Sequence, residues 1–432
     1  MQFVKGSRKV IQQGDELPDW EDQSATLSRQ MSELFDAQNL SVLIGSGCSS
    51  MWKDEAEQGI PTMGPMAGEF CGWFNGMPDV NPAATVTYKQ KSDLLSKVGI
   101  DITAPEYQKN LERLMEVLLN AESFCEASKD ADLHAATGLI GDIIKGVQEF
   151  VLTKCTTGKF QTDDSVVDLY RRFYRSLSTR SRGLRPPWVF TTNYDLFNER
   201  ALDRNTTPYS NGFTGTVERF FNPSAYRLAL AEQLDISSKR WSAVDGFVHL
   251  CKLHGSVNWV EQEGTSLFPI IEKLDPKASE DRVMIYPTPS KQTASFGSPY
   301  ADLFREFQRQ VVQDQSVLIT MGYSFGDEHV NNIIFQGLTV PGFKLVIFSD
   351  PEAATANETI KKLYALGDPR VWFIWGDGDG DGDGDEGTQP AHYFSTIVDH
   401  LLPTSVDDSV ESAIDDARKM LLSKDQAPTN EG

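Results

Sequence analysis

A short apolar run that ends in small polar residues is the first stretch of this chain with the makings of a chemical site. Residues 41–44 are Ser-Val-Leu-Ile, the length of a buried strand, and Gly45, Ser46 and Gly47 follow directly. Because glycine has no Cβ, such a turn can bring main-chain N–H groups close to a phosphate. The third glycine of the common dinucleotide-binding fingerprint is absent, so for this stretch alone an ordinary strand-to-loop turn is an equal alternative.

Four further apolar runs are each followed at once by a polar turn. Residues 188–192, 247–253, 316–321 and 344–348 have the composition of strands. In an open parallel sheet, ligands bind outside the carboxyl ends of the strands, so these turns are expected to gather at one edge. The residues that we single out in them are Asn193, Asp195, His254, Gly322, Ser324 and Asp350.

Each of these residues also has a simpler explanation. Asn193 and Asp195 could bond their own backbone in a turn, and His254 could be a satisfied histidine before a glycine. Asp350 could cap the helix that follows it. Taken singly, these alternatives are at least as good as a functional role. Their order along the chain, always after a strand, favours a nucleotide site.

Charge limits the partners of the chain. The 432 residues include 40% hydrophobic residues, enough for a sizeable core, and carry a formal net charge of −22. This charge argues against non-specific binding to nucleic acid or to an anionic membrane, so we expect neither partner. An anionic ligand would need a locally arranged site.

Cysteine usage indicates a reducing compartment and no structural metal. The five cysteines are widely spaced and no CxxC pair occurs, so we expect reduced thiols and no zinc ribbon. The first residues lack the apolar stretch of a signal peptide, and no run approaches the roughly 20 apolar residues of a membrane span. We therefore expect a cytoplasmic protein that holds no metal.

Strands that alternate with helical patterns predict an α/β fold, a Rossmann-like, mostly parallel sheet with a helical insertion. The stretch at 51–65 is expected to be a loop, and the chain before residue 234 is expected to turn helical. The predicted organisation is a polar arm at 1–22, the main domain at 23–403 with its insertion at about 100–182, a Gly-Asp linker loop at 376–388, and a C-terminal helix and tail at 404–432. Calcium is the alternative for the Gly-Asp run, but Thr388 stands where an EF-hand loop needs its last carboxylate.

The ordered set of motifs resembles the sirtuin family, in its bacterial sirtuin-like branch. Gly45-Ser-Gly47 is similar to the family's Gly-Ala-Gly turn, and Gly59-Ile-Pro61 to its Gly-Ile-Pro loop. Thr191-Thr-Asn193-Tyr-Asp195 resembles the Thr-Gln-Asn-x-Asp motif, and Leu253-His254-Gly255 the motif with the catalytic histidine. Gly322-Tyr-Ser324 lies where the family has a turn beside NAD.

Differences from the motifs of the family's deacetylases indicate which branch of the family the chain resembles. The two zinc-binding CxxC pairs are missing, Thr192 replaces the usual Gln, and Thr62-Met-Gly64 follows the Gly-Ile-Pro loop in place of Asp-Phe-Arg. Other stretches resemble the branch whose members hydrolyse NAD in anti-phage defence. They are Asn211-Gly-Phe-Thr-Gly215, Phe221-Asn-Pro223, Ile285-Tyr-Pro-Thr288 and the run from Gly322 to His329.

The resemblance implies an NAD glycohydrolase with NAD+ as its substrate. Asn193 would orient the attacking water or a ribose hydroxyl, and His254 would act as general base. Gly45, Ser46 and Gly47 would hold the pyrophosphate through their N–H groups. Asp195 would fix Asn193 or meet the ribose. The remaining candidates, Gly322, Ser324 and Asp350, would flank the adenosine half.

The resemblance also implies partners. Similar proteins are often paired with a HerA-type hexameric ATPase, which would have to be a separate chain because no Walker motif occurs here. Control by assembly is expected, so a homo-oligomer is predicted. Two alternatives stay open: an NAD-dependent protein deacylase, and a non-catalytic sensor that binds NAD or ADP-ribose.

Overall fold

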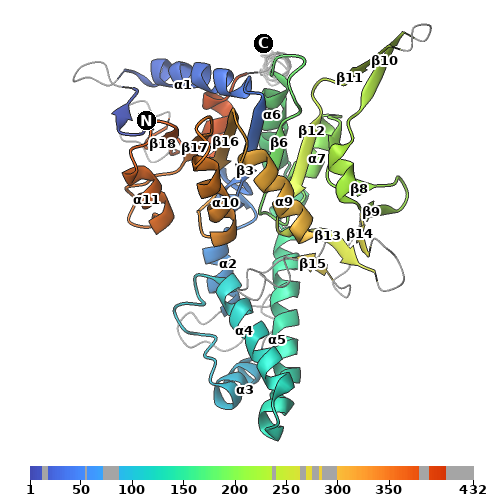
Figure 1. The fold of residues 1–432 in the computed structure, drawn as a ribbon. Coiled ribbons are helices and arrows are strands. Elements are labelled where there is room, and N and C mark those ends of the chain that lie inside the picture. The colour runs from blue at the N-terminus through green and yellow to red at the C-terminus, as the bar shows by residue number, and fades with distance from the viewer. Residues whose placement is uncertain are drawn as a thin grey trace, which may run out of the picture.

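A large, mostly parallel sheet forms the centre of the computed structural model (Figure 1). The structure describes residues 1–11, 18–53, 56–71, 87–235, 240–262, 269–274, 282–284, 299–378 and 389–404. The sheet consists of β1 (Gln2–Lys5), β2 (Arg8–Lys9), β3 (Asn39–Ile44), β6 (Trp188–Thr191), β7 (Tyr209–Ser210), β12 (Val248–Lys252), β16 (Ser316–Met321), β17 (Lys344–Phe348) and β18 (Val371–Trp375). Their spatial order is β2-β1-β18-β17-β16-β3-β6-β12-β7.

The strand order is that of a doubly wound fold. After the edge strands β1 and β2, the chain enters the middle of the sheet at β3, adds β6 and β12 on one side, and then adds β16, β17 and β18 on the other. All pairings among these strands are parallel, whereas β1 and β2 pair antiparallel at the edge. The direction of addition reverses between β3 and β16, which is where such sheets bind ligands, at their carboxyl edge. The predicted Rossmann-like α/β class is confirmed.

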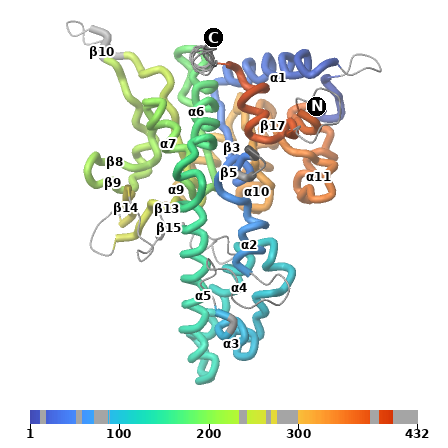
Figure 2. Tube along the Cα trace, turned by 180° about the vertical axis from the view of Figure 1, so that it is seen from behind, coloured from blue at the N-terminus to red at the C-terminus, as the bar shows by residue number. Residues whose placement is uncertain are grey.

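Helices cover both faces of the sheet because alternate residues of each strand point to opposite sides. In β16, Val317, Ile319 and Met321 belong to one core cluster and Leu318 to the other. The first cluster packs against α1 (Trp20–Phe35), α6 (Ser165–Ser178) and α7 (Phe197–Arg204), which lie in front in Figure 2. The second packs against α9 (Tyr300–Val311), α10 (Glu328–Leu338) and α11 (Glu358–Ala365).

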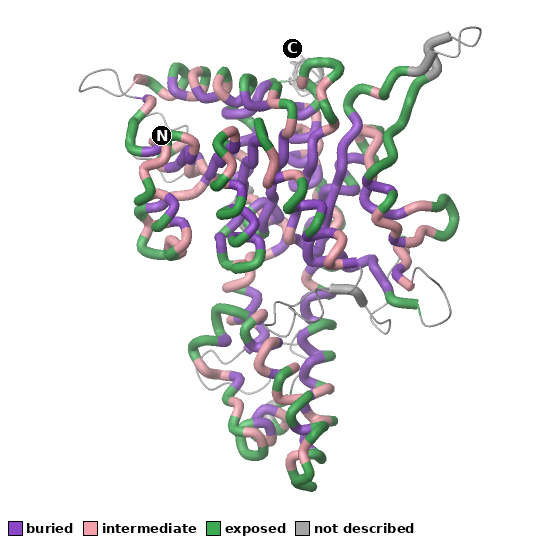
Figure 3. Tube along the Cα trace, viewed as in Figure 1, coloured by how far each residue is buried: buried purple, intermediate pink, exposed green. Residues whose placement is uncertain are grey.

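A group of helices projects from the sheet (Figure 1). It comprises α2 (Met63–Cys71), α3 (Tyr88–Val98), α4 (Leu111–Ala127) and α5 (Ala131–Thr156). Asn110 and Asp130 start α4 and α5 as N-caps, since their side chains accept main-chain N–H bonds of the first turn. Figure 3 shows the sheet strands buried and the outer surfaces of these helices exposed. The projecting group differs from the insertion predicted at about 100–182, because it already includes α2 and α3, and because α6 packs on the sheet.

Smaller β elements flank the large sheet. A five-stranded sheet joins β15 (Arg282–Met284), β13 (Gly255–Glu261), β14 (Ile270–Glu272), β9 (Arg219–Phe221) and β8 (Phe213–Thr214). Two hairpins are formed by β4 (Ser50–Lys53) with β5 (Ala56–Gly59), and by β10 (Ala231–Asp235) with β11 (Arg240–Ala243). Near the end of the described chain, α12 (Phe394–Thr396) leads into a π-helical turn at Ile397–Leu401.

Three sequence expectations are wrong. Residues 2–5 are not part of a loose arm, because β1 pairs with β18 and buries Phe3 and Val4. The stretch at 51–65 contains a hairpin and the start of α2, and β10 replaces the helix expected before residue 234.

Residues 379–388 of the Gly-Asp run and 405–432 of the tail lie outside the described residues. Among the helices described, none combines the length and apolar composition that crossing a bilayer requires.

Candidate functional site

The predicted site residues follow five consecutive strands at the carboxyl edge of the sheet. Along the edge, Asp350 follows β17, Gly322 and Ser324 follow β16, and the Gly45–Gly47 turn follows β3. Asn193 and Asp195 follow β6, and His254 follows β12. Parallel pairing therefore brings together turns that are as much as 300 residues apart in the chain, as expected for the ligand edge of this fold.

Asn193 is buried with one unsatisfied polar atom. Its Nδ2 donates to the Gly45 carbonyl at 2.9 Å and to Ser49 Oγ at 2.8 Å, and its own N–H donates to Thr191 Oγ1 at 3.0 Å. Its Oδ1 is buried and has no hydrogen-bond partner among the residues that the structure describes. Because a buried acceptor without a partner is costly, this oxygen is suited to accept a hydrogen bond from a ligand hydroxyl or from water.

Ser49 joins Asn193 to Asp195. The Ser49 hydroxyl accepts from Asn193 and donates to Asp195 Oδ2 at 2.6 Å, while Asp195 Oδ1 accepts the Phe197 N–H at 3.1 Å. The side chains of all three linked polar residues are buried. Asp195 thus fixes Asn193 through Ser49 and also caps the first turn of α7, so the first of its two predicted roles has a structural basis.

His254 is paired with a carboxylate that the sequence reasoning did not assign. His254 Nε2 lies 2.8 Å from Asp327 Oδ2, and both side chains are largely buried. Burial alone would raise the pKa of Asp327, but the hydrogen bond and charge of His254 and the amides of Val330 and His329 outweigh it and hold that pKa well below its usual range. An ionised carboxylate only accepts, so Nε2 donates this hydrogen bond, and in the neutral form of the ring Nδ1 is the nitrogen without a proton.

Asn193 and His254 occupy equivalent places on neighbouring strands. Thr191 and Lys252 are partners in the β6–β12 register, so each candidate lies two positions beyond that pair. The Leu253 N–H donates to the Thr191 carbonyl at 2.8 Å, which keeps the two strand ends together. The rings of His254 and of Tyr194, which follows Asn193, have centroids 6.4 Å apart. The two predicted catalytic residues therefore share one part of the edge.

The glycines of the first turn serve packing. A Cβ on Gly45 would lie 2.3 Å from the Gly322 carbonyl oxygen, and one on Gly47 would lie 3.0 Å from Gly322 Cα. The Gly45 N–H donates to the Met321 carbonyl and the Gly47 N–H to the Gly322 carbonyl. The expectation that these two N–H groups are available to a pyrophosphate is therefore wrong. Ser46 is exposed, and its contact with a ligand stays a prediction.

In the turns after β16 and β17, some of the predicted site residues have packing or hydrogen-bond partners within the protein, and others are exposed. Gly322 has a φ of 60° and packs against Cys48, which explains why glycine is needed there. Ser324 is exposed. Asp350 Oδ1 accepts the N–H groups of Glu352 and Ala353, so it caps a local turn, while α11 starts later with Asn357 as its cap. Contact of Ser324 and Asp350 with an adenosine group stays a prediction.

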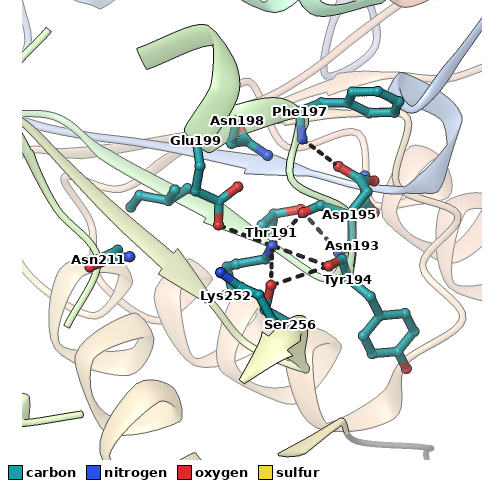
Figure 4. A network of polar contacts seen from close by, with 12 residues as sticks. Thr191, Asn193, Tyr194, Asp195, Phe197, Asn198, Glu199, Asn211, Lys252 and Ser256 are labelled. Atoms are coloured by element: carbon teal, nitrogen blue, oxygen red, sulfur yellow. Dashed lines mark hydrogen bonds and ion pairs between the residues drawn. The ribbon is translucent and has the colours of Figure 1, made fainter. Parts of the chain in front are cut away.

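A buried lysine supports the loop that carries Asn193 and Asp195 (Figure 4). Lys252 Nζ lies 3.1 Å from Glu199 Oε1 and 2.8 Å from Ser256 Oγ. It also donates to the carbonyls of Tyr194 and Asp195. Burial raises the pKa of Glu199, and the positive charge of Lys252 offsets part of that rise. The lysine thereby ties α7, the end of β6 and the start of β13 together beneath the candidate site.

Ser49, Asp327 and Lys252 are the functional candidates that sequence reasoning missed. The sequence does hold signals for two of them. Lys252 is the one lysine within the apolar run 247–253, and a charge in such a run indicates a buried, paired group. Asp327 precedes a helical pattern, which predicts an N-cap but not its second contact with His254. Nothing in the local sequence distinguishes Ser49 from its serine neighbours.

The fold is that of a doubly wound α/β protein, with a cluster of polar side chains at the carboxyl edge of its sheet. The family model described as the SIR2-like domain matches residues 187–364, which contain Asn193, His254 and Asp327. The match supports a Sir2-like protein, and because SIR2-like domains use NAD it is compatible with an NAD-related activity. No curated protein matches the chain. Within the described ranges, no three His, Cys, Asp or Glu side chains gather as a metal ion would require.

Proposed function

We propose that this chain is an NAD+ glycohydrolase that releases ADP-ribose and nicotinamide. The observation that carries the proposal is the buried, unpartnered Oδ1 of Asn193, at a strand end that adjoins the strand carrying His254. A hydrogen-bond acceptor, Asn193 Oδ1, and a base, His254, at the same edge of the sheet are suited to bind a water molecule and remove its proton. The SIR2-like match over this region supports NAD as the substrate.

The side chains divide the work in the proposed reaction. The bond between the ribose anomeric carbon and nicotinamide breaks, and its electron pair leaves with nicotinamide. Asn193 Oδ1 accepts a hydrogen bond from the attacking water, whose oxygen adds to the anomeric carbon. His254 Nδ1 takes the proton of that water, and Asp327 stabilises the imidazolium that forms, as a carboxylate partner does for other histidine bases.

In this proposal, the activity depletes NAD during anti-phage defence in the cytoplasm. The resemblance of the stretches around Asn211, Phe221 and Gly322 to the bacterial branch supports this role. Uncontrolled NAD loss would harm the host cell, so the protein acts as a homo-oligomer, with a separate HerA-type ATPase as its partner. Light scattering of the pure chain, alone and mixed with such an ATPase encoded nearby, tests both statements.

Nicotinamide release tests the activity. The pure protein is incubated with NAD+, with and without an acetylated peptide, and compared with Asn193→Ala and His254→Ala. Asn120→Ala and His134→Ala are matched controls, because both side chains are exposed and lie on the projecting helices α4 and α5. Release without peptide that only the first two variants abolish supports hydrolysis. Release that requires the peptide would indicate a deacylase, and NAD binding without release would indicate a sensor.

A further inference from the structure

A cavity of about 360 Å³ lies at the opposite edge of the sheet from the candidate site. It is bordered by Asn39 at the start of β3, Trp188 at the start of β6 and His249 near the start of β12. Its size falls within the range of small-molecule sites. Since β6 and β12 also carry Asn193 and His254 at their other ends, the two places are separated by the length of the same strands.

The lining of the cavity is basic in an acidic protein. The chain has 62 acidic and 40 basic residues, yet the described residues that border this cavity include Arg185 and Arg309 and no carboxylate. Arg185 Nη1 donates to Asn39 Oδ1 at 3.0 Å, and Arg309 Nη2 pairs with Glu306 at 2.6 Å. A guanidinium has five N–H donors, so these contacts orient both side chains and leave donors for a ligand.

One residue that lines the cavity has an unsatisfied polar atom. His249 is 7% exposed, and its Nδ1 is buried without a hydrogen-bond partner among the described residues. Its ring stacks on Trp188 with centroids 4.4 Å apart and an interplanar angle of 22°. Burial, aided by the charge of Arg309, lowers the pKa of His249 to about 4, so the ring is neutral at pH 7. A neutral imidazole nitrogen left buried is suited to a polar ligand group.

The helix end beside the cavity is already capped. The last carbonyls of α9 would repel an anion if they were free. However, the Ser316 hydroxyl donates to the carbonyls of Val311 and Gln313, and Gln313 Nε2 donates to the carbonyl of Gln310. The negative end of the helix is thereby partly satisfied, so Arg185 and the Arg309–Glu306 pair are the charged side chains that decide the potential at the cavity.

We propose that this cavity binds a small phosphate-bearing molecule. The guanidinium groups of Arg185 and Arg309 hold the phosphate, since two such groups suit a dianion. The uncharged part of the ligand lies against Trp188 and satisfies Nδ1 of His249. The site does not depend on the NAD+ reaction proposed above, so either proposal can fail without the other.

Isothermal titration with AMP and with inorganic phosphate tests the site. The variants are Arg185→Gln alone, because the described side-chain contact of Arg185 is with the neutral Asn39 amide, and Arg185→Gln with Arg309→Gln. The matched control is Arg182→Gln, since the Arg182 side chain is 90% exposed, pairs with Asp245 and does not border the cavity. Thermal melting of each variant verifies that it is folded.

We expect AMP to bind the unaltered chain and to bind at least about tenfold more weakly to both variants, with the control unchanged. AMP binding tighter than phosphate identifies an organic phosphate as the ligand, and equal binding identifies phosphate itself. Two results overturn the proposal: no saturable binding of either probe at millimolar concentration, or AMP binding that the double variant retains with unchanged affinity and unchanged stoichiometry, which would place all of the bound AMP elsewhere.

Discussion

His254 Nε2 lies 2.8 Å from Asp327 Oδ2, a bond between the end of β12 and the N-terminus of α10. The same carboxylate accepts the N–H groups of His329 and Val330 through Oδ1, so the helix holds it in position. The pair fixes the tautomer of the histidine and turns a helix cap into part of the candidate active site. The catalytic contribution of the Asp327 carboxylate can be separated from its role as a helix cap, because asparagine caps helices about as strongly as aspartate does.

Replacing Asp327 with Asn is therefore expected to leave the protein folded and to lower catalysis. The neutral amide cannot stabilise an imidazolium, so kcat for nicotinamide release should fall about a hundredfold, with a smaller change in KM. Steady-state kinetics on pure protein measures both constants. Glu328→Gln, one residue on and exposed, is the matched control. Unchanged kcat in Asp327→Asn would show that the pair has no catalytic role.

Ser49→Ala tests whether the serine bridge positions Asn193. The change leaves Asn193 Nδ2 and Asp195 Oδ2 each without one buried partner, which is expected to cost about 1–3 kcal/mol of unfolding free energy. It should also lower kcat, because Asn193 is then held by the Gly45 carbonyl alone. Urea unfolding and kinetics provide the two readouts. Ser32→Ala, which removes an exposed hydroxyl of α1, should change neither quantity.

Most of the sheet could be predicted from the sequence because its strands are buried on both faces. Ser316–Met321 and Lys344–Phe348 are continuous apolar runs with polar ends, and their observed bounds agree with the predicted ones. The clustering of Asn193 and His254 also followed from the rule for parallel strands. In contrast, β1 is short and becomes a strand only because β18 offers it an edge, so local composition could not reveal it.

Local sequence patterns could not predict the contacts within the site. Asp327 and His254 are 73 positions apart, and Ser49 and Asp195 are 146 apart, so neither pair leaves a spacing signal. The glycines of the first turn misled the phosphate assignment for a related reason. A Gly-x-Gly turn indicates a close approach of backbone, but the partner of Gly45 is the backbone of Gly322, from a strand that no local rule brings near.

Lys252→Met is expected to destabilise the protein strongly. The Lys252 side chain is 1% exposed and neutralises Glu199, so its removal leaves a buried carboxylate alone, at a cost of about 3–5 kcal/mol. Urea unfolding measures this loss. Adding Glu199→Gln should recover part of the stability, because the unpaired charge is then gone. Lys145→Met, at an exposed position of α5, is the control. An equal loss of stability in Lys252→Met and in Lys145→Met would contradict the argument.

His249 should make the protein less stable in mild acid. Its pKa is about 4 in the folded chain, lowered from 6.5 by burial and by Arg309, so below pH 6.5 the unfolded chain binds a proton that the folded chain does not. Stability therefore falls as the pH drops from 7 toward 4, by about 2 kcal/mol between pH 7 and pH 5 from this group. Urea unfolding at the two pH values measures the difference.

His249→Phe keeps a ring beside Trp188 but cannot take up a proton, so its loss of stability between pH 7 and pH 5 should be about 2 kcal/mol smaller than that of the unaltered chain. His134→Phe, at an exposed position of α5, is the control for the change itself. Because only the difference between the two pH values is compared, an altered packing energy in His249→Phe cancels. An undiminished pH effect in that variant would mean that another group causes the acid sensitivity.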